Sequence, residues 1–322
     1  MKRRLILSGA VGAVGVSTLS RAQTPRPPGK IGFLQSGPIT ADSTTTVPML
    51  RAAWQRLGYV EGETVLLRSG EGDPRRVPQL AAELIDLKVG VLIVVGGEAV
   101  RLAAQVTKTT PIVAIDLEID PVRSGLARSR AKPGGNVTGL FMDQPALVGK
   151  WIGLLRDAAP AIERLALLWD PGTGRDQLES GQTVARAKGL QTEVIEYDRG
   201  TNFDDALRGL VNKRPTGIVV LTSPNFRRSI FAPMAQKYRL PAIAFQANQA
   251  HTGVLMSYGP KREHYFPRAV ILADKILKGE KPGDLPIEGP DRFELTINLK
   301  TAKALGLTIP QSLLLRADEV IQ

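Results

Sequence analysis

The chain has 322 residues, of which 43% are hydrophobic and 23% charged, and its formal net charge is +11. This length suits one large or two medium domains with a sizeable core. The absence of cysteine excludes a disulfide framework, a thiolate metal site, a cysteine nucleophile and a lipid attached to an N-terminal cysteine.

Residues 1–22 have the pattern of a cleaved export signal. Lys2-Arg3-Arg4 is a positively charged start, Leu5–Leu19 is an apolar run rich in small residues, and Ser20-Arg21-Ala22 fits the small–x–small cleavage pattern. Cleavage removes four basic residues and no acid, so the net charge falls from +11 to +7. An uncleaved anchor is the alternative, but the apolar run is short for a membrane span. We predict a periplasmic protein that is not embedded in the membrane, exported by the general or the twin-arginine route.

The basic residues of the remaining chain are scattered. They gather only as pairs, such as Arg75-Arg76, Arg227-Arg228 and Lys261-Arg262. Nucleic-acid binding favours a basic stripe with interleaved aromatic residues. We therefore expect a solvated basic surface and no nucleic-acid partner.

The first part of the chain alternates predicted strands and helices. Its clearest unit is Val89–Asp116, in which the continuous apolar run Val91–Val95 is typical of a parallel strand covered on both faces. Gly96-Gly97 then makes a tight turn into a helix. The elements expected here are strand Ile31–Gln35, helix Pro48–Leu57, strand Thr64–Arg68, a helix from Asp73 through Leu87, strand Val91–Val95, helix Glu98–Thr107 and strand Ile112–Ile115.

The second part begins after a turn-rich segment. We predict that Lys132–Gly139 is the first crossover between two lobes, and that His251–Gly259 is the second. The elements expected around them are helix Leu147–Ala158, strands within Arg164–Asp170 and Ala187–Tyr197, strand Ile218–Leu221, strand Ala242–Phe245, helix Glu263–Gly279, strand Phe293–Leu299 and helix Thr301–Leu305.

The second part repeats the order of the first. Lys30–Ser36 matches Arg164–Asp170, and Val89–Asp116 matches Thr216–Asn248, each at a separation of about 130 residues. The constant separation favours two similar α/β lobes over the alternative that any α/β protein shows such units. We place lobe one at residues 30–138 and about 257–290, and lobe two with a hinge strand at residues 139–256 and about 291–322. Several passages between lobes make a hinge that suits closure around a ligand.

Candidate binding residues follow the predicted strands of both lobes. Gly96 and Gly97 could offer backbone N–H groups to an anion, and Asp116 and Asp120 could pair with a ligand ammonium. Structural turns are the alternative for both pairs. A few polar groups among apolar walls are typical of a small-molecule site. The candidate set is Gln35, Ser36, Gly96, Gly97, Glu98, Asp116, Asp120, Ser223, Phe245, Gln246 and Tyr258.

The sequence lacks the motifs of common enzyme classes. It contains no G-x-S-x-G, P-loop, H-E-x-x-H or EF-hand loop, and the run from Gly96 to Arg101 is not G-x-G-x-x-G. His251 and His264 have no clear acid partner in the sequence, and two histidines are too few for a typical structural zinc site. Asp116 and Asp120 could form a glycosidase pair, but nothing fixes their separation. We expect no catalytic residues, no metal and no cofactor.

Several segments resemble one known family. They are DPVRSGL at Asp120–Leu126, KPGGNVTG at Lys132–Gly139, VLMSYG at Val254–Gly259, DKILKGEKPGDLPIE at Asp274–Glu288 and FELTINLKTAKALGLTIPQSLLLRADEVI at Phe293–Ile321. Together they resemble the bacterial ABC transporter substrate-binding family that includes tryptophan- and tyrosine-binding proteins. The resemblance covers essentially all of the chain after the signal. It implies a type I periplasmic-binding fold, two α/β lobes with parallel sheets and a multi-crossover hinge, and an ABC permease and ATPase as partners.

The first hypothesis is therefore a monomeric solute receptor of an ABC importer. The resemblance implies a small ligand such as an amino acid, aromatic ones included. The family often has Gly-Thr-Pro-Ala at the turn that here is Gly96-Gly97-Glu98-Ala99, where a carboxylate replaces a hydroxyl. An exported enzyme acting on a small ester or sugar, and a ligand-sensing partner of a membrane kinase, are the alternatives. A sugar-responsive repressor with a two-lobe fold would need DNA-binding helices where the export signal lies.

Overall fold

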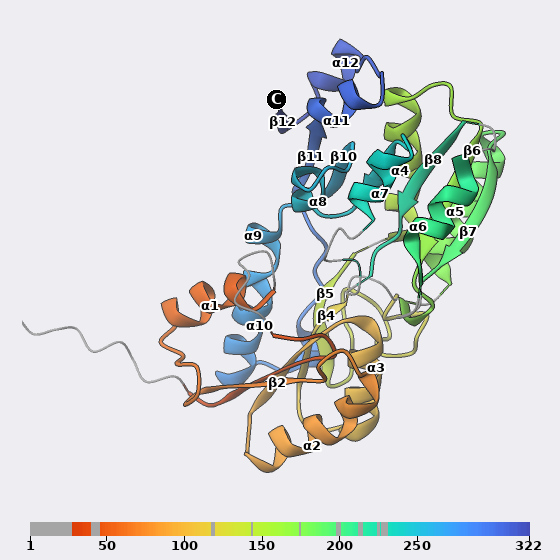
Figure 1. Cartoon of the computed structure of the whole chain (residues 1–322). Helices are drawn as coiled ribbons and strands as arrows, with labels where there is room; N and C mark the ends of the chain where they lie inside the picture. The colour runs from red at the N-terminus through yellow and green to blue at the C-terminus, as the bar shows by residue number, and fades with distance from the viewer. Residues whose placement is uncertain are drawn as a thin grey trace, which may run out of the picture.

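Two lobes, each built on one β-sheet, make up the computed structural model (Figure 1). The structure describes residues 28–39, 46–116, 120–142, 144–173, 175–197, 201–211, 215–223, 226 and 231–322. The predicted export signal, residues 1–22, lies outside these ranges. Among the helices described, none is both long enough and apolar enough to cross a membrane.

Lobe one alternates strands and helices as predicted. Its elements are β1 (Ile31–Gln35), α1 (Thr46–Arg56), β2 (Val65–Ser69), α2 (Val77–Asp86), β3 (Val91–Val95), α3 (Gly97–Val106), β4 (Ile112–Asp116) and β5 (Val137–Phe141). All five strands are parallel, in the order β2-β1-β3-β4-β5. The expected bounds of β1 and β3 are confirmed to the residue.

The sheet of lobe one is buried between two helical layers. Val91 and Ile93 on β3 belong to the core cluster that includes α1 and α10 (Pro267–Leu277), whereas Leu92 and Val94 pack with α2 and α3. Successive side chains of a strand point to opposite faces, and here both faces are covered. This is why the strand sequence is a continuous apolar run.

Lobe two repeats this arrangement. Its elements are α4 (Gln144–Ala158), β6 (Arg164–Trp169), α5 (Asp176–Ala187), β7 (Gln191–Glu196), α6 (Phe203–Val211), β8 (Thr216–Val220), α7 (Ala232–Lys237), β9 (Ala242–Ala244), α8 (Ala247–His251), β10 (Met256–Pro260), β11 (Phe293–Asn298), α11 (Leu299–Ala304), α12 (Gln311–Leu314) and β12 (Glu319–Ile321). The sheet order is β12-β11-β10-β9-β8-β6-β7, and only β10 and β11 are antiparallel. The run β7-β6-β8-β9-β10 reproduces β2-β1-β3-β4-β5, so the internal repeat is confirmed.

Two segments expected as crossovers contain strands instead. Part of Lys132–Gly139 belongs to β5 in the first sheet, and part of His251–Gly259 belongs to β10 in the second. The strand β5 was not recognised in the sequence, because Gly139 lies inside it and a glycine within a short strand interrupts the strand pattern. The residue has φ 139°, and a Cβ there would collide with the backbone of Ala114 on β4. The chain therefore leaves the first sheet after residue 141 and the second after residue 260, a few residues later than expected.

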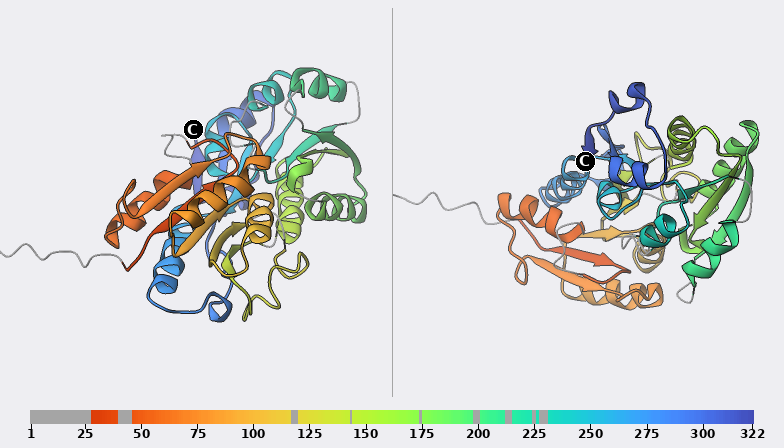
Figure 2. Two further views of the ribbon diagram at one scale, coloured as in Figure 1. Left: turned by 90° about the horizontal axis from the view of Figure 1, so that it is seen from below. Right: turned by 45° about the horizontal axis from the view of Figure 1, so that its top comes forward.

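The helix expected over Glu263–Gly279 is divided in two. It forms α9 (Arg262–Tyr265) and α10, and the break falls at Pro267. Proline has no N–H to donate within a helix and is favoured in the first turn. Both views of Figure 2 show this blue segment against the orange part of lobe one, far from it in sequence, in agreement with the packing of α10 on α1 and β3.

One buried hydroxyl ties together the three passages between the lobes. The first passage begins after β5, the second begins after β10, and the third leads into β11. Tyr265, on α9 in the second passage, donates from Oη to the carbonyl oxygens of Phe141 (3.0 Å), where the first passage begins, and of Glu288 (3.1 Å) in the third. The N–H of Phe141 also donates to the Glu288 carbonyl at 2.9 Å. Tyr265 is 3% exposed, so this junction lies inside the hinge.

Replacing Tyr265 with phenylalanine removes the hydroxyl and keeps the ring. We expect the free energy of unfolding to fall by about 1–2 kcal/mol, because buried carbonyls lose a donor. Urea unfolding followed by circular dichroism measures the change. The matched control is Tyr197→Phe, since Tyr197 stacks on Phe203 and its hydroxyl has no recorded bond within the described residues; it should cost less than about 0.5 kcal/mol. Equal losses in the two variants would contradict the role of Tyr265.

Candidate functional site

Each sheet has a switch point, where the strand order reverses. It lies between β1 and β3 in lobe one and between β6 and β8 in lobe two. Open α/β sheets bind ligands outside the carboxyl ends of their strands at such points. Ser36, Gly96 and Asp170 come directly after β1, β3 and β6, and Ser223 follows β8 by three residues. These four residues mark the place where a ligand is expected.

A cavity of about 80 Å³ lies between the lobes at these strand ends. Lobe one contributes Ser36, Gly37, Gly72, Pro74, Gly96, Gly97, Glu98 and Ala99, and lobe two contributes Asp170, Gly172 and Thr173. Four predicted site residues, Ser36, Gly96, Gly97 and Glu98, thus line one cavity. At about 30 Å³ per water, the cavity has room for roughly three water molecules.

The wall from lobe one is the amino-terminal end of α3. Gly96 caps this helix with φ 95°, and its own N–H donates to the carbonyl of Ile115 at 3.0 Å. Glu98 and Ala99 lie in the first turn, where backbone N–H groups have no acceptor within the helix. These donors and the helix dipole make this end of α3 electropositive.

The carboxylate of Glu98 is neutralised along the helix. It pairs with Arg101, one turn further on, at 2.6 Å, and this hydrogen bond raises the pKa of the Arg101 guanidinium. The pair lies on the exposed side of α3. Glu98 therefore does not cancel the positive end of the helix, although its carboxylate stands in the first turn.

The wall from lobe two centres on Asp170, which is 6% exposed. Its Oδ1 accepts from the N–H of Gly172 at 2.9 Å, and its Oδ2 accepts a hydrogen bond from the hydroxyl of Ser223. The backbone carbonyl of Asp170 accepts from the Thr173 hydroxyl at 2.7 Å. A buried carboxylate needs such donors or a cation to offset its lost hydration. Asp170 is thus held in place with its charge beside the cavity.

Gln177 on α5 fastens this wall to β8. Its Nε2 donates to the hydroxyl of Thr173 and to the carbonyl of Thr222, both at 2.8 Å, and its Oε1 accepts from the N–H of Thr222 at 2.9 Å. Gln177 is fully buried. The short 3-10 turn η2 (Pro171–Thr173) is therefore rigidly placed opposite α3.

Other predicted site residues lie around the cavity without lining it. Gln35 is buried and donates to the carbonyls of Gly37 (3.0 Å) and Pro38 (2.7 Å), which shapes the loop after β1. Ser223, Phe245 and Gln246 line a much smaller cavity, of about 10 Å³, at the ends of β8 and β9. These residues therefore lie at the strand ends of lobe two, beside the cleft cavity.

Three further candidates have other surroundings. The carboxylate of Asp120 accepts from the N–H groups of Val122 and Arg123, which is the pattern of a turn cap. Tyr258 stacks on Phe293, and its pKa is raised by burial and by Asp318. Asp116 ends β4, but its side chain lies outside the described residues, and so does Glu118.

Two buried charged residues that follow strands of lobe two were not in the predicted set. Asp170 could have been found, because Arg164–Asp170 matches Lys30–Ser36 and Asp170 takes the place of Ser36. Arg262, at the start of α9, is 8% exposed; it donates to Gln246 Oε1 at 3.4 Å and lies 4.8 Å from the ring centre of Phe266. Its sequence signal was only a basic pair. Within the described part of the chain, no group of three or more His, Asp or Glu side chains could hold a metal ion.

Comparisons with known proteins agree with this architecture. The ABC domain in complex with L-Trp from Streptococcus pneumoniae has a TM-score of 0.81 and 23% identity, with 91% of this chain and 99% of that chain covered. The ligand-free, open structure of a substrate-binding protein with adhesive properties from Clostridium difficile has a TM-score of 0.64 and 23% identity over the same shares. The fold is that of type I periplasmic binding proteins.

A curated relative and a family model extend the comparison to the sequence. The tyrosine-binding protein of Clostridioides difficile (strain R20291) is 25% identical over 259 residues, which cover 78% of this chain and 73% of that protein. The model of the family described as ABC transporter substrate binding protein matches residues 39–321. This match spans both lobes and confirms the resemblance found in the sequence. The chain therefore belongs to the ABC transporter substrate-binding protein family.

Proposed function

We propose that the chain is the solute receptor of an ABC importer and binds an amino acid in the cavity between its lobes. The observation that carries this proposal is the chemistry of the two facing walls. Lobe one offers the N–H donors of α3, and lobe two offers the carboxylate of Asp170. An α-carboxylate would accept from the N–H groups of Glu98 and Ala99, and an ammonium would donate to Asp170.

A zwitterion that bridges both walls would also drive closure. Such a ligand interacts with both lobes at once only when they are together, so it binds the closed form more tightly than the open form. The differential affinity shifts the hinge toward the closed form, which a permease could then recognise. We propose that the closed protein binds an ABC permease, which works with an ATPase, and that the protein is located in the periplasm.

The volume of the cavity limits the size of the ligand's side chain. About 80 Å³ accommodates the main-chain part of an amino acid, and a large side chain needs further separation of the lobes. The L-Trp complex and the tyrosine-binding relative support an aromatic ligand. We therefore propose aromatic amino acids as the first ligands to test, with small ones as the alternative.

The site we propose is a revision of the predicted set. Ser36, Gly97 and Thr173 would surround the ligand, and Ser223 would hold Asp170 in place. We propose no ligand contact for Asp120 or Tyr258, because one caps a turn and the other stacks on Phe293. Phe245 and Gln246 would shape the floor beneath.

Hydrolysis is less well supported than binding. Asp170 and Ser223 form a hydrogen-bonded pair, but a serine nucleophile also needs a base such as histidine. His251 pairs with Glu319 on β12 at 3.1 Å, and His264 lies exposed on α9. Within the described residues, neither histidine belongs to the lining of the cleft cavity.

An ion pair crosses the cleft and would help to hold it closed. Arg123, in the loop after β4 of lobe one, lies 3.3 Å from Asp176 at the start of α5 in lobe two. The side chains are 70% and 30% exposed. An exposed pair contributes roughly 0–1 kcal/mol, so it can bias the hinge without locking it.

Asp170→Asn keeps the shape of the side chain and removes its charge. We expect the affinity for the bound amino acid to fall about 30-fold or more, because the ammonium loses its charged partner. The ligand is first found by thermal shift of the mature protein against amino acids, sugars and small carboxylates, and calorimetry then compares the variants. Asp120→Asn is the matched control and should change affinity less than about twofold.

The outcomes of this experiment separate two claims. If no amino acid raises the melting temperature, the proposed ligand class is wrong. If an amino acid binds and Asp170→Asn leaves its affinity unchanged, the class stands and the assignment of the ammonium to Asp170 is wrong.

Asp176→Asn breaks the pair across the cleft. We expect small-angle scattering to show a more open unliganded protein and ligand affinity to fall by at most about fivefold, in keeping with an exposed ion pair. Glu179→Gln is the control, since Glu179 lies on the same helix and pairs with Arg175 at 3.5 Å within lobe two. A change of the same size in Glu179→Gln would rule out a specific contribution from the pair.

A further inference from the structure

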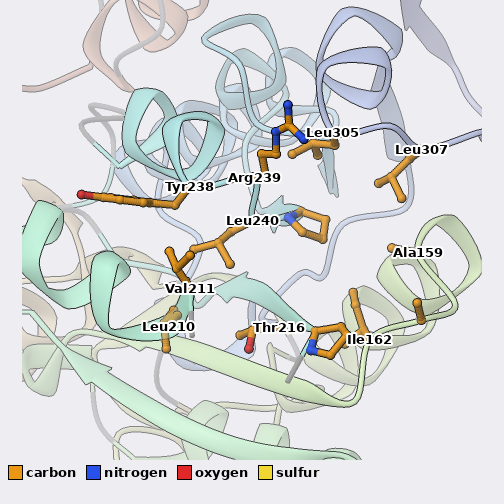
Figure 3. Close-up of a pocket in the computed structure, with 13 residues that line it drawn as sticks. Ala159, Ile162, Leu210, Val211, Thr216, Tyr238, Arg239, Leu240, Leu305 and Leu307 are labelled. Atoms are coloured by element: carbon orange, nitrogen blue, oxygen red, sulfur yellow. The ribbon is translucent and has the colours of Figure 1, made fainter. Parts of the chain in front are cut away.

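A larger cavity lies in lobe two, outside the cleft, at the amino-terminal ends of the strands (Figure 3). Its volume is about 230 Å³. The walls come from the segments before β6, β8 and β9, the end of α6 and the segment after α11. Ile162, Leu210, Leu240, Leu305 and Leu307 are the large aliphatic side chains that line it.

Backbone groups at the floor of this cavity are already hydrogen-bonded. The carbonyl of Pro215 accepts from the N–H groups of Glu163 (2.9 Å) and Arg164 (3.2 Å), and the carbonyl of Pro241 accepts from Ile218 at 2.8 Å. These two carbonyls therefore already have donors. An apolar body is the group that such a surface favours.

A positively charged side chain, that of Arg239, lies at the rim of the cavity and has no acidic partner among the described residues. Arg239 is exposed and makes no recorded ion pair there, and Figure 3 shows its side chain extending to the Leu305 side of the cavity. The acidic residue Asp204, on α6, does not pair with Arg239 but with other residues. It binds Lys237 (2.8 Å), Arg208 and Tyr238 (2.9 Å).

Three donors surround the carboxylate of Asp204. The hydrogen bonds from Lys237, Arg208 and Tyr238 lower its pKa to about 2. Among the described residues that line the cavity, none is acidic. Among the described residues, no acidic side chain competes with a carboxylate from solvent for the guanidinium of Arg239.

We propose that this cavity is a second binding site, for a small carboxylate with an apolar body. The body would fill the space between the aliphatic side chains, and the carboxylate would pair with Arg239 at the rim. At about 30 Å³ per water, 230 Å³ corresponds to roughly eight water volumes. That is close to the size of benzoate or hexanoate, and the site is separate from the cleft.

The probe for this site is 4-fluorobenzoate, observed by fluorine NMR, with neutral 4-fluorobenzyl alcohol as its matched control. We expect the acid to bind the mature protein with a Kd below about 1 mM and more tightly than the alcohol. Arg239→Gln should weaken the acid about three- to fivefold and leave the alcohol unchanged, because only the acid uses the charge and the guanidinium is exposed. Val211→Trp places a large ring at the rim and should weaken both probes.

Two controls keep the site distinct from the cleft. Asp170→Asn should bind 4-fluorobenzoate as the parent does, and a mixture of the common amino acids should not displace it. The proposal is overturned by absence of binding at about 5 mM probe, by an Arg239→Gln variant with unchanged affinity for the acid, or by displacement with amino acids. None of these results depends on the ligand of the cleft, so the two proposals fail separately.

Discussion

Parallel pairing around β1 and β6 is the constraint on which the rest of the structure depends. Because neighbouring strands run the same way, all their carboxyl ends emerge at one edge of each sheet. The residues after them, Ser36 and Gly96 in one lobe and Asp170 and Ser223 in the other, are gathered there by topology rather than by sequence proximity. The hinge then places one edge opposite the other, and the cavity that we propose as the site lies between them.

The two edges are alike in backbone but differ in chemistry. In lobe one, β3 leads into the open end of α3, which supplies hydrogen-bond donors. In lobe two, β6 ends at Asp170, which supplies a charge that Ser223 and Gly172 hold in place. Internal repetition gives the cleft its shape, and the divergence of a few residues gives it polarity. A ligand with both a carboxylate and an ammonium would, in our proposal, contact both edges.

Much of the fold could be predicted from the sequence, because buried parallel strands are continuous apolar runs. Gly139 shows where this reasoning stops, since a glycine that allows β5 to approach β4 looks like a turn residue until the partner strand is known. The site was harder to predict. Asp120 follows a strand, as a ligand-binding acid would, but its carboxylate accepts a hydrogen bond from a backbone N–H of the turn that it caps. The position of the Asp170 carboxylate depends on a hydrogen bond from Ser223, which is distant in sequence, and Asp170 was not predicted. Only the comparison of the two repeats could have indicated it.

The central claim is that one amino acid joins the first turn of α3 to Asp170 between closed lobes. A crystal structure of the chain from Gln23 onward, grown from a mixture of amino acids, tests it most directly. The account predicts density for one amino acid, with its carboxylate at the N–H groups of Glu98 and Ala99 and its ammonium at Asp170. A ligand bound in the cleft without contact to Asp170, or closed lobes with an empty cleft in the presence of the mixture, would contradict it.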